Sequence, residues 1–568
     1  MNAETFCEHF ATFADAPEGI KKLRHLILQL AVQGKLTTRE TTDHPVKDLR
    51  GEMESARQRM IGAGTIRHGD QFTPVSAEET PYSLPENWTW VRIGEVMHLI
   101  NGKAFKPTDW LTSGLPIVRI QNLNNPDAPF NYAGEDVDDK VRLQNDDFLI
   151  SWSGTPGTSF GAFIWDRGPA VLNQHIFRAI LYGKAFIKPF LKLAVNARLD
   201  EMIAQAHGGV GLQHITKGKL ERLSLPLAPL AEQSRIVAKV DQLLALCDEL
   251  AARQAAQRQK RQRLVGATLD RLVSTRSPAE FPTHTHRLRN HFDQLFDTPT
   301  TIPQLRQTIL QLALQGQLVP VRRNEEVTAE TLLAMERERM SLSFASGDQP
   351  KLESEYAALR AAGPNQDGSR RYISARCICD FITKGTTPAA SELMPQGDVP
   401  FLKVYNIVKN VLNFEYKPTF VRKIVHETEL RRSKIQPGNV LMNLVGPPLG
   451  KVAVVTEEYP EWNCNQALVI FKPISFYDSK FLSYIIGCPA TLKEILQDTR
   501  GTAGQDNISL EQSRNLRIPL VSLEYQRRFI AEVTELLSLC DALEAKLTQA
   551  ESAGTQLLSA AVHSLLQN

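Results

Sequence analysis

Cysteine is scarce in this sequence, and the few cysteines form no recognisable pattern. No C-x-x-C pair is present, and the number of cysteines is odd. Both features favour reduced cytosolic thiols over a disulfide framework or a structural zinc site. The seven are Cys7, Cys247, Cys377, Cys379, Cys464, Cys488 and Cys540.

Long apolar runs are missing too. No stretch of about 18 apolar residues occurs, so we expect no membrane-spanning segment and no membrane partner. The first residues, MNAETFCEHFATFADAPEG, include acidic side chains and lack the apolar core of a secretory signal. We therefore expect the protein to be cytoplasmic.

The chain as a whole lacks a charge excess of either sign. Its 65 Lys and Arg residues are balanced by 63 Asp and Glu residues, so a nucleic-acid-binding surface would have to be local. The net charge is +5 over residues 370–520, +2 over 88–226 and +6 over 252–276. These values are compatible with DNA contact, although a basic helix flank can equally serve solvation.

Signatures of catalysis are absent as well. The chain has neither the N-P-P-Y or D-P-P-Y motif of adenine methyltransferases nor an H-E-x-x-H motif. The segment 446–451, GPPLGK, lacks the spacing and the Ser or Thr of a phosphate-binding P-loop. His284, His286 and His291 stand in a polar linker that we do not interpret as a metal site. We therefore expect this chain to be non-catalytic and to hold no metal or cofactor.

What the sequence does contain is an internal repeat. Residues 23–36, LRHLILQLAVQGKL, and residues 305–318, LRQTILQLALQGQL, are identical at ten of fourteen positions. Further matches follow in the same order, ending with residues 223–250 against 516–543 at an offset of 293. At 42% hydrophobic residues, the 568-residue chain has the composition of a folded protein of roughly three or four domains.

The two copies have diverged unevenly. Their helical segments match well, whereas the first insert (83–226) and the second insert (372–520) match only at scattered positions. Each insert has short β-rich runs, such as LPIVRI and VPFLKV, separated by Gly, Pro, Asn and Asp turns, and is predicted to be mixed α/β. The inserts either drifted without constraint or bind two different targets.

A long helix is predicted after each insert. Apolar residues alternate at spacings of four and three, which is typical of a coiled-coil seam, and each helix of about 40 residues would be about 60 Å long. A helix with one apolar stripe needs a partner, and we expect the two to pair antiparallel about a pseudo-twofold axis. The predicted seam residues are Ile236, Val240, Leu243, Cys247 and Leu250, and then Phe529, Val533, Leu536, Cys540, Leu543 and Leu547, with Ala550, Gly554, Leu557 and Ala561 continuing the register.

The ILQLA helices (20–33 and 302–315) are predicted to end at Gly34 and Gly316, since glycine is a favoured C-cap residue. The second of these helices follows the first long helix, but nothing comparable follows the second long helix. We therefore expect the N-terminal ILQLA helix to pack there and to close a ring of two halves.

Taken together, these motifs resemble the specificity subunit of type I restriction–modification systems. LPENWTWVRIGEV resembles the start of that family's target recognition domain. LAEQSRIVAKVDQLL and LEYQRRFIAEVTELL resemble the start of its spacer helices, and ILQLAxQGxL resembles its other conserved helix. The similarity covers essentially the whole chain, and the repeated order of the motifs is its strongest part.

The resemblance implies an α+β fold: two α/β target recognition domains with pseudo-twofold symmetry, separated by two long antiparallel coiled-coil helices. The expected boundaries are an N-terminal helical region (1–82, a repeat of 302–370), the first insert (83–226), a central spacer helix (227–274), a linker and helical region (275–371), the second insert (372–520) and a C-terminal spacer helix (521–568).

The resemblance also implies function. Two recognition domains would contact the two parts of a bipartite, asymmetric double-stranded DNA site, and the helices would set the gap. Two modification subunits would supply adenine-N6 methylation with S-adenosylmethionine, and restriction subunits would use ATP and Mg. A coiled-coil adaptor that presents two protein-binding domains is the alternative, and an enzyme with an unrecognised active site is a third possibility.

Base contacts need Arg, Lys, Asn, Gln, Ser or Thr on exposed loops. Copy-shared residues are better explained as turn or capping residues, because two readers of different sequences should differ where they read. The shared pairs are Asn122 and Asn406, Asn173 and Asn465, and Gln174 and Gln466. The unshared candidates are Lys103, Lys106, Arg119, Gln121, Asn124, Ser151, Ser153, Thr155 and His175 in the first insert, and Lys384, Thr386, Thr387, Lys403, Tyr405, Lys409, Asn443, Arg500 and Gln505 in the second.

Overall fold

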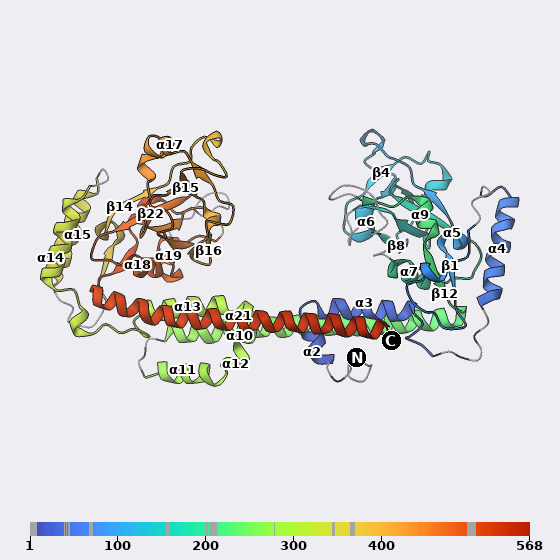
Figure 1. Ribbon diagram of the computed structural model, residues 1–568, viewed down its shortest axis with the longest axis horizontal. Coiled ribbons are helices and arrows are strands. Elements are labelled where there is room, and N and C mark those ends of the chain that lie inside the picture. The colour runs from blue at the N-terminus through green and yellow to red at the C-terminus, as the bar shows by residue number, and fades with distance from the viewer. Residues whose placement is uncertain are drawn as a thin grey trace. The chain divides into compact units, whose positions relative to one another are not determined.

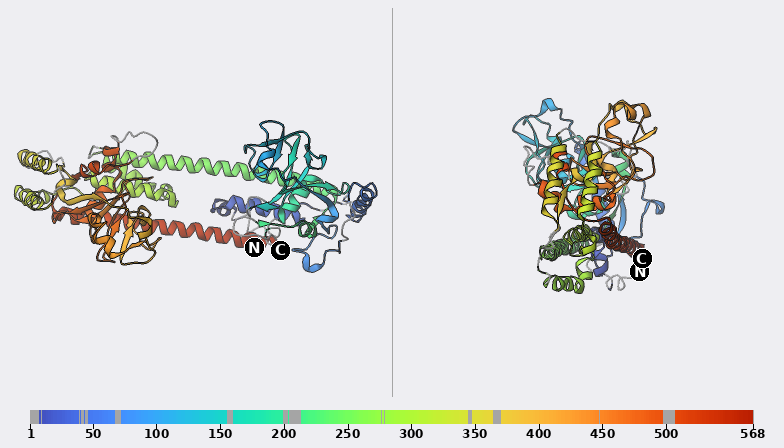
Figure 2. Two further views of the ribbon diagram at one scale, coloured as in Figure 1. Left: turned by 90° about the horizontal axis from the view of Figure 1, so that it is seen from above. Right: turned by 90° about the vertical axis from the view of Figure 1, so that its left-hand side faces the viewer.

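Two compact units make up the chain in the computed structural model (Figures 1 and 2). One comprises Met1–Arg258 with Ala550–Asn568, and the other comprises Gln259–Gln549. The residues that the structure describes are 8, 10–38, 40, 43, 46–66, 72–154, 160–198, 203, 213–275, 277, 279–343, 347–363, 370–446, 448–496 and 507–567.

The two long helices, α10 (Leu230–Ser274) and α21 (Leu523–Gln567), contribute residues to both units. The other elements of the first unit, with η marking a 3-10 helix, are α2 (Phe10–Asp15), α3 (Gly19–Val32), α4 (Val46–Gly62), η1 (Ala77–Glu79), β1 (Thr89–Arg92), α5 (Ile93–Val96), β2 (Met97–Asn101), η2 (Pro107–Asp109), β3 (Leu115–Val118), α6 (Ile120–Asn124), β4 (Asn131–Ala133), η3 (Asp139–Val141), β5 (Arg142–Leu143), β6 (Phe148–Ser151), β7 (Ser153–Gly154), β8 (Gly161–Ile164), β9 (Ala170–Leu172), β10 (Ile176–Leu181), α7 (Lys188–Ala197), β11 (Gln213–His214), α9 (Lys217–Arg222) and β12 (Ser224–Leu227).

After its part of α10, the second unit continues with helices in the region predicted as a polar linker, where α11 contains both His284 and His286. Its elements are α11 (Phe281–Asn290), α12 (Phe292–Leu295), η4 (Pro299–Thr301), α13 (Ile302–Leu314), η5 (Arg323–Glu325), α14 (Ala329–Ser341), α15 (Gln349–Ala362), β13 (Tyr372–Ser374), α16 (Ala375–Ile378), β14 (Cys379–Lys384), η6 (Ala390–Glu392), β15 (Val399–Leu402), η7 (Val404–Asn406), β16 (Ile407–Val408), β17 (Val411–Leu412), β18 (Phe420–Val421), α17 (Lys423–Glu427), η8 (Arg431–Ser433), β19 (Val440–Asn443), β20 (Val452–Val454), β21 (Asn463–Cys464), β22 (Leu468–Pro473), α18 (Ser479–Ile486), α19 (Pro489–Leu496), α20 (Leu510–Arg514) and β23 (Arg517–Pro519).

The two inserts share one sheet topology, which confirms the predicted α/β repeat. A four-stranded sheet of order β2-β10-β6-β8 in the first insert corresponds to β14-β22-β19-β20 in the second. The pair β1-β12 corresponds to β13-β23, and the run β4-β3-β9 corresponds to β18-β15-β21. Duplication therefore preserved the strand order while the loops diverged.

Each insert buries its main sheet on both faces. In β6, Phe148 and Ile150 belong to the core on the α7 side, whereas Leu149 belongs to the core shared with the second sheet. In β19, Val440 and Leu441 divide between two cores in the same way. Because successive strand side chains point to opposite faces, the near-continuous apolar runs of the sequence follow from this double burial.

In the first unit, α3 lies antiparallel to α10. Gln254 donates a hydrogen bond to the carbonyl oxygen of Ala14 (3.1 Å), near the start of this contact. Further along, the Arg24 guanidinium pairs with the Asp248 carboxylate. A third contact joins Arg235 to Asp43, which follows α3. The contact positions therefore descend along α10 as they ascend from α2 through α3.

The same helix runs parallel to the end of α21. Lys22 donates to the carbonyl oxygen of Thr555 (3.1 Å), and Lys35 donates to that of Leu566 (3.2 Å). It follows that α10 and α21 are antiparallel within this unit. Their shared core with α2 and α3 consists of Phe13, Ala14, Leu23, Leu26, Cys247, Leu558, Ala561 and Val562. This packing confirms that the N-terminal ILQLA helix covers the end of the second long helix.

The second unit repeats this arrangement with the roles of the long helices exchanged. Arg306 of α13 pairs with Glu544 (2.8 Å), and the hydroxyl of Tyr525 donates to the carbonyl oxygen of Val319 (2.9 Å), so α13 is antiparallel to α21. Gln317 donates to the carbonyl oxygen of Thr275 (2.8 Å). The shared core contains Val265, Leu269, Leu295, Phe296, Ile302, Leu305, Ile309 and Cys540.

The predicted coiled-coil seam is wrong at the start of each long helix. Ile236 and Val240 belong to the core of the first insert, and Phe529 and Val533 belong to that of the second, so these four pack on their own insert. Cys247 and Cys540 do lie in the cores that the two long helices share with the ILQLA helices, with Leu250, Leu536, Leu543 and Leu547 partly buried beside them. Leu243 is half-buried.

Further along, the buried stripe shifts by one residue. Leu557 was expected in the seam but is 60% exposed, whereas Leu558 is fully buried. In α10, Leu264 is likewise exposed and Val265 is buried. A straight helix drifts about 20° per heptad relative to a 3.5-residue repeat, which amounts to nearly one residue position after four heptads.

Both ILQLA helices end as predicted. Gly34 and Gly316 have φ values of 71° and 78°. The following amides, of Lys35 and Gln317, bond to the carbonyl oxygens of Leu30 and Leu312, both at 2.9 Å. This is the pattern of a Schellman C-cap. None of the described helices is both long enough and apolar enough to span a membrane, and all six described cysteines are free and buried.

We expect the packing of the end of α21 against α2, α3 and α10 to depend on Leu558. Leu558→Ala should lower the free energy of unfolding by about 2–5 kcal/mol, because it removes a buried side chain and leaves a cavity. Leu557→Ala, one residue away and exposed, is the matched control and should change stability little. Chemical denaturation of both variants checks this; equal losses for the two would contradict the packing.

Candidate nucleic-acid interface

Strand ends meet at one edge of the first insert. β3 and β9 run parallel, so Arg119 and Asn173, which follow them, emerge on the same side. β2 is antiparallel to β10, so the end of β2 reaches the start of β10. A bridge between Lys103 and Asn173 joins the two. We call the side chains brought together here the first edge: Lys103, Arg119, Gln174 and His175.

The second insert repeats the construction. β15 and β21 run parallel, so Lys403 and Asn465 emerge together, and β14 is antiparallel to β22. The amide of Thr386 donates to the carbonyl oxygen of Cys464 at 3.0 Å, just as the amide of Lys103 donates to that of Leu172 at 2.9 Å. The second edge consists of Lys384, Thr386, Thr387, Lys403 and Gln466.

A glycine makes each edge possible. A Cβ on Gly102 would lie 2.1 Å from the carbonyl oxygen of Asn173, and one on Gly385 would lie 2.1 Å from that of Asn465. No side chain fits at that distance, so the backbone of one strand end can cross the other only at glycine. The neighbouring residues of the two edges are thereby held at equivalent positions.

Asn122 and Asn406 are structural residues, which confirms the capping interpretation for this pair. The side-chain oxygen of Asn122 accepts from the amide of Arg119 (3.1 Å), and that of Asn406 accepts from the amide of Lys403 (2.9 Å). Asn406 also donates to the carbonyl oxygens of Asn413 and Tyr416. Each asparagine is buried and ties the edge to the loop that follows.

Aromatic rings lie beneath the cations of both edges. The Arg119 guanidinium stands 5.7 Å from the ring centre of Trp110, which is 40% exposed. Lys403 lies over Tyr405 (5.9 Å) and Lys417 over the exposed ring of Tyr416 (5.3 Å). Such pairs offer both a charge for phosphate and a face for stacking. Our sequence reasoning missed Trp110, Tyr416 and Lys417, although alternating basic and aromatic residues could have indicated them.

Polar atoms without a protein partner occur at both edges. Among the described residues, Arg119 Nε and Gln174 Oε1 are buried and lack a hydrogen-bond partner, as does Asn465 Oδ1 in the second insert. Buried polar atoms are normally paired. The edges therefore retain hydrogen-bonding capacity that the fold itself does not use.

Several candidate residues are unsuited to reading bases here. Ser151, Ser153 and Asn443 are buried, whereas base contacts require exposed side chains. Asn443 is also used by the fold, because its oxygen accepts from the amide of Lys451 at 2.7 Å. Lys409 is exposed and pairs with Glu544 of α21 (2.8 Å), and it stays a prediction.

The remaining candidates stay predictions. Lys106, Gln121 and Asn124 are exposed, and Tyr405 is half-buried with its hydroxyl 3.3 Å from that of Thr419. Three others, Thr155, Arg500 and Gln505, lie outside the described residues.

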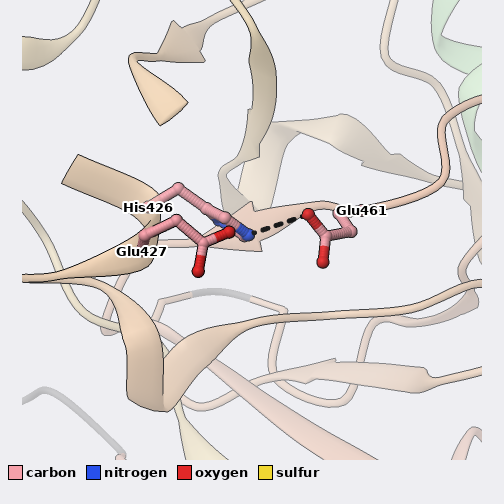
Figure 3. Close-up of side chains that lie close together, drawn as sticks. All are labelled: His426, Glu427 and Glu461. Carbon is pink, nitrogen blue, oxygen red and sulfur yellow. Dashed lines mark ion pairs between the residues drawn. The ribbon is translucent and has the colours of Figure 1, made fainter. Parts of the chain in front are cut away.

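One cluster has the composition of a metal site. The side chains of His426, Glu427 and Glu461 lie close together (Figure 3), and their potential ligand atoms are within 4.8 Å of one another. His426 is fully buried, its Nε2 atom is 3.5 Å from Glu461 Oε2, and burial together with nearby Lys434 lowers the pKa of its ring. The two carboxylates already pair with Lys423 and Lys434.

The neighbour of this histidine argues against a metal. Asn463 accepts from the amide of Cys464 (2.9 Å) and donates to the carbonyl oxygen of Leu430 (3.1 Å), which determines which side of its amide group carries nitrogen. That nitrogen faces His426 Nδ1 at 3.1 Å. Nδ1 must therefore accept, and the proton of the neutral ring resides on Nε2, the atom that a metal would need.

Comparison with known proteins identifies relatives of this architecture. A family model described as "Type I restriction modification DNA specificity domain" matches residues 85–257 and 376–551. The type I restriction enzyme EcoEI specificity subunit of Escherichia coli is 25% identical over 567 residues, covering 95% of this chain and 93% of that protein. The EcoAI specificity subunit of Escherichia coli is 28% identical over 333 residues, covering 57% of this chain and 56% of that protein.

A solved structure of a type I R-M system includes a chain that is 18% identical to this one. The match covers 86% of this chain and 100% of that chain, with a TM-score of 0.46.

The glycine crossings predict the effect of single methyl groups. Gly102→Ala and Gly385→Ala should each lower the free energy of unfolding by about 3 kcal/mol, because the added Cβ forces backbone apart in a packed region. Gly218→Ala, where nothing lies within 4 Å, is the control and should be neutral or stabilising by up to ~1 kcal/mol in its helix. Thermal melting of the three variants tests this. If Gly102→Ala or Gly385→Ala left the stability unchanged, the close backbone approach at that glycine would be wrong.

Proposed function

The chain belongs to the type I restriction–modification DNA specificity family, and we propose that its two inserts read the two halves of one bipartite, asymmetric double-stranded DNA site. The observation that carries this proposal is the pair of edges: one backbone frame, built twice, that presents different side chains. A frame that is kept while its exposed residues change is what two readers of unlike sequences require.

Equivalent positions of the two edges differ in chemistry. The glycine crossings align Lys103 with Thr386, and the capping asparagines align Arg119 with Lys403. Arg can bond guanine in a bidentate manner, whereas Thr and Lys offer fewer donors or another geometry. We propose that such differences let the two half-sites differ.

The long helices supply the gap. Each has 45 residues, hence a length of about 67 Å, and each contributes to both units. A fixed separation between readers sets the spacing of half-sites, as in dimeric DNA-binding proteins. Because the readers here are parts of one chain, the site need not be palindromic.

The chain belongs to a non-catalytic specificity family, and we propose that the reaction takes place on other subunits. We propose two modification subunits that methylate adenine N6 with S-adenosylmethionine, joined by restriction subunits that use ATP and Mg. The long helices expose leucines at equivalent positions of the two copies: Leu246 and Leu557 in the first unit, Leu539 and Leu264 in the second. A surface that occurs twice suits two copies of one partner.

The half-site assignment is tested by mapping methylation in a host that expresses this chain with its modification subunit. Arg119→Ala should relax only the first half of the methylated motif and Lys403→Ala only the second, by roughly 1–3 kcal/mol of discrimination at one base pair. Gln549→Ala, on the exposed side of α21, serves as control. A change in both halves from one substitution would refute the assignment, and absence of any wild-type motif would refute the proposed function.

Subunit docking is tested by native mass spectrometry of the complex. The pair Leu246→Lys and Leu557→Lys should reduce the number of bound modification subunits from two to one, since a charge would have to be buried in an apolar contact. The pair Leu539→Lys and Leu264→Lys should do the same at the other unit. Retention of two subunits by both double variants would exclude these leucines from the interface.

A further inference from the structure

Gln233 joins the start of α10 to the first insert. The side chain is fully buried. Its oxygen accepts from the amide of Ile187, the N-cap residue of α7, at 2.9 Å. Its nitrogen donates to the carbonyl oxygens of Ala185 and Ala228, both at 2.8 Å. The side chain of Gln233 thus links the start of the long helix to the loop before α7.

Gln526 makes the same joint in the second insert. It too is fully buried. Its oxygen accepts from the amide of Asp478, the N-cap residue of α18, at 2.8 Å. Its nitrogen donates to the carbonyl oxygens of Phe476 (2.9 Å) and Val521 (3.3 Å). The contact survived divergence of the inserts, including the different sequences around α7 and α18.

Two residues later, an arginine holds the other side of each long helix. Arg235 bonds Asp43 through both terminal nitrogens, at 3.1 and 2.8 Å. Arg528 bonds Glu325 through Nε (2.8 Å) and a terminal nitrogen. The two carboxylates belong to the segments that follow α3 and α13. Glutamine therefore faces the insert, and arginine faces the conserved helical frame.

We propose that Gln233 and Gln526 are positioning residues for DNA recognition: they set the angle at which each insert leaves its long helix, and thereby the gap length that the protein accepts. This inference rests on the proposed function. The physical reason is directional. A buried apolar contact tolerates small rotations, whereas a side chain bonded to one amide and two carbonyl groups does so only at the cost of unsatisfied buried polar groups.

A small change of this angle would be amplified at the DNA. The first edge lies on the insert joined to the start of α10 and the second on the insert joined to the start of α21, and each half-site must meet its edge in register. Loss of the Gln233 or Gln526 contacts leaves every base-reading side chain intact. It should therefore affect the accepted gap and leave the half-site sequences unchanged, which separates positioning from reading.

The test uses the full chain co-expressed with its modification subunit and sequencing of the host methylome. Gln233→Met and Gln526→Met keep the volume of the side chain and remove its hydrogen bonds. We expect methylation of sites whose gap is one base pair longer or shorter to rise by about tenfold or more relative to wild type, a factor comparable to the cost of one mismatched base pair. Gln549→Met, exposed on α21, should leave gap selectivity unchanged.

Unaltered gap selectivity in a folded Gln→Met variant would overturn the inference, and so would altered half-site bases. If either variant does not fold, Gln233→Glu and Gln526→Glu replace it, since a carboxylate keeps the contact to the N-cap amide and loses those to the carbonyl groups. Wild-type protein that directs no bipartite methylation would refute the proposed function instead, so the two failures are distinguishable.

Discussion

A helix of 45 residues with one apolar stripe must cover that stripe along its whole length, and the rest of the structure follows from this requirement. The insert attached to each long helix covers its first turns. The ILQLA helices and the other long helix cover the remainder, as the cores around Cys247 and Cys540 show. The N-terminal ILQLA helix completes the core at the end of the second long helix.

This closure explains why the duplicated frame diverged less than the inserts. Leu23 and Leu26 of α3 share a buried core with residues of both long helices, and a substitution there would disturb the packing of both. The edges are constrained differently. Glycine at the crossing and asparagine at the cap hold the backbone, so the side chains that point outward can vary without altering the fold.

In the buried His426 cluster, a neighbouring residue determines which ring nitrogen carries the proton. The composition of the cluster alone suits a metal ion, but the orientation of Asn463 assigns the imidazole proton to Nε2. The same reasoning gives Gln233 and Gln526 their meaning. In each case backbone groups fix which side of a buried side-chain amide donates and which side accepts. That orientation determines what the neighbouring group can do.

The sequence by itself determined the repeat, the α/β character of the inserts, the two long helices and the C-caps at Gly34 and Gly316, because each leaves a local signal in periodicity or residue type. Only the tertiary structure decided the rest. It showed that Leu558 and not Leu557 is buried, because a 3.6-residue helix drifts against a heptad pattern. It removed Ser151, Ser153 and Asn443 from the exposed candidates and added Trp110, since burial depends on strands that are distant in sequence. It also revealed that Gln233 and Gln526 join each long helix to its insert, a contact across nearly fifty residues that no local pattern encodes.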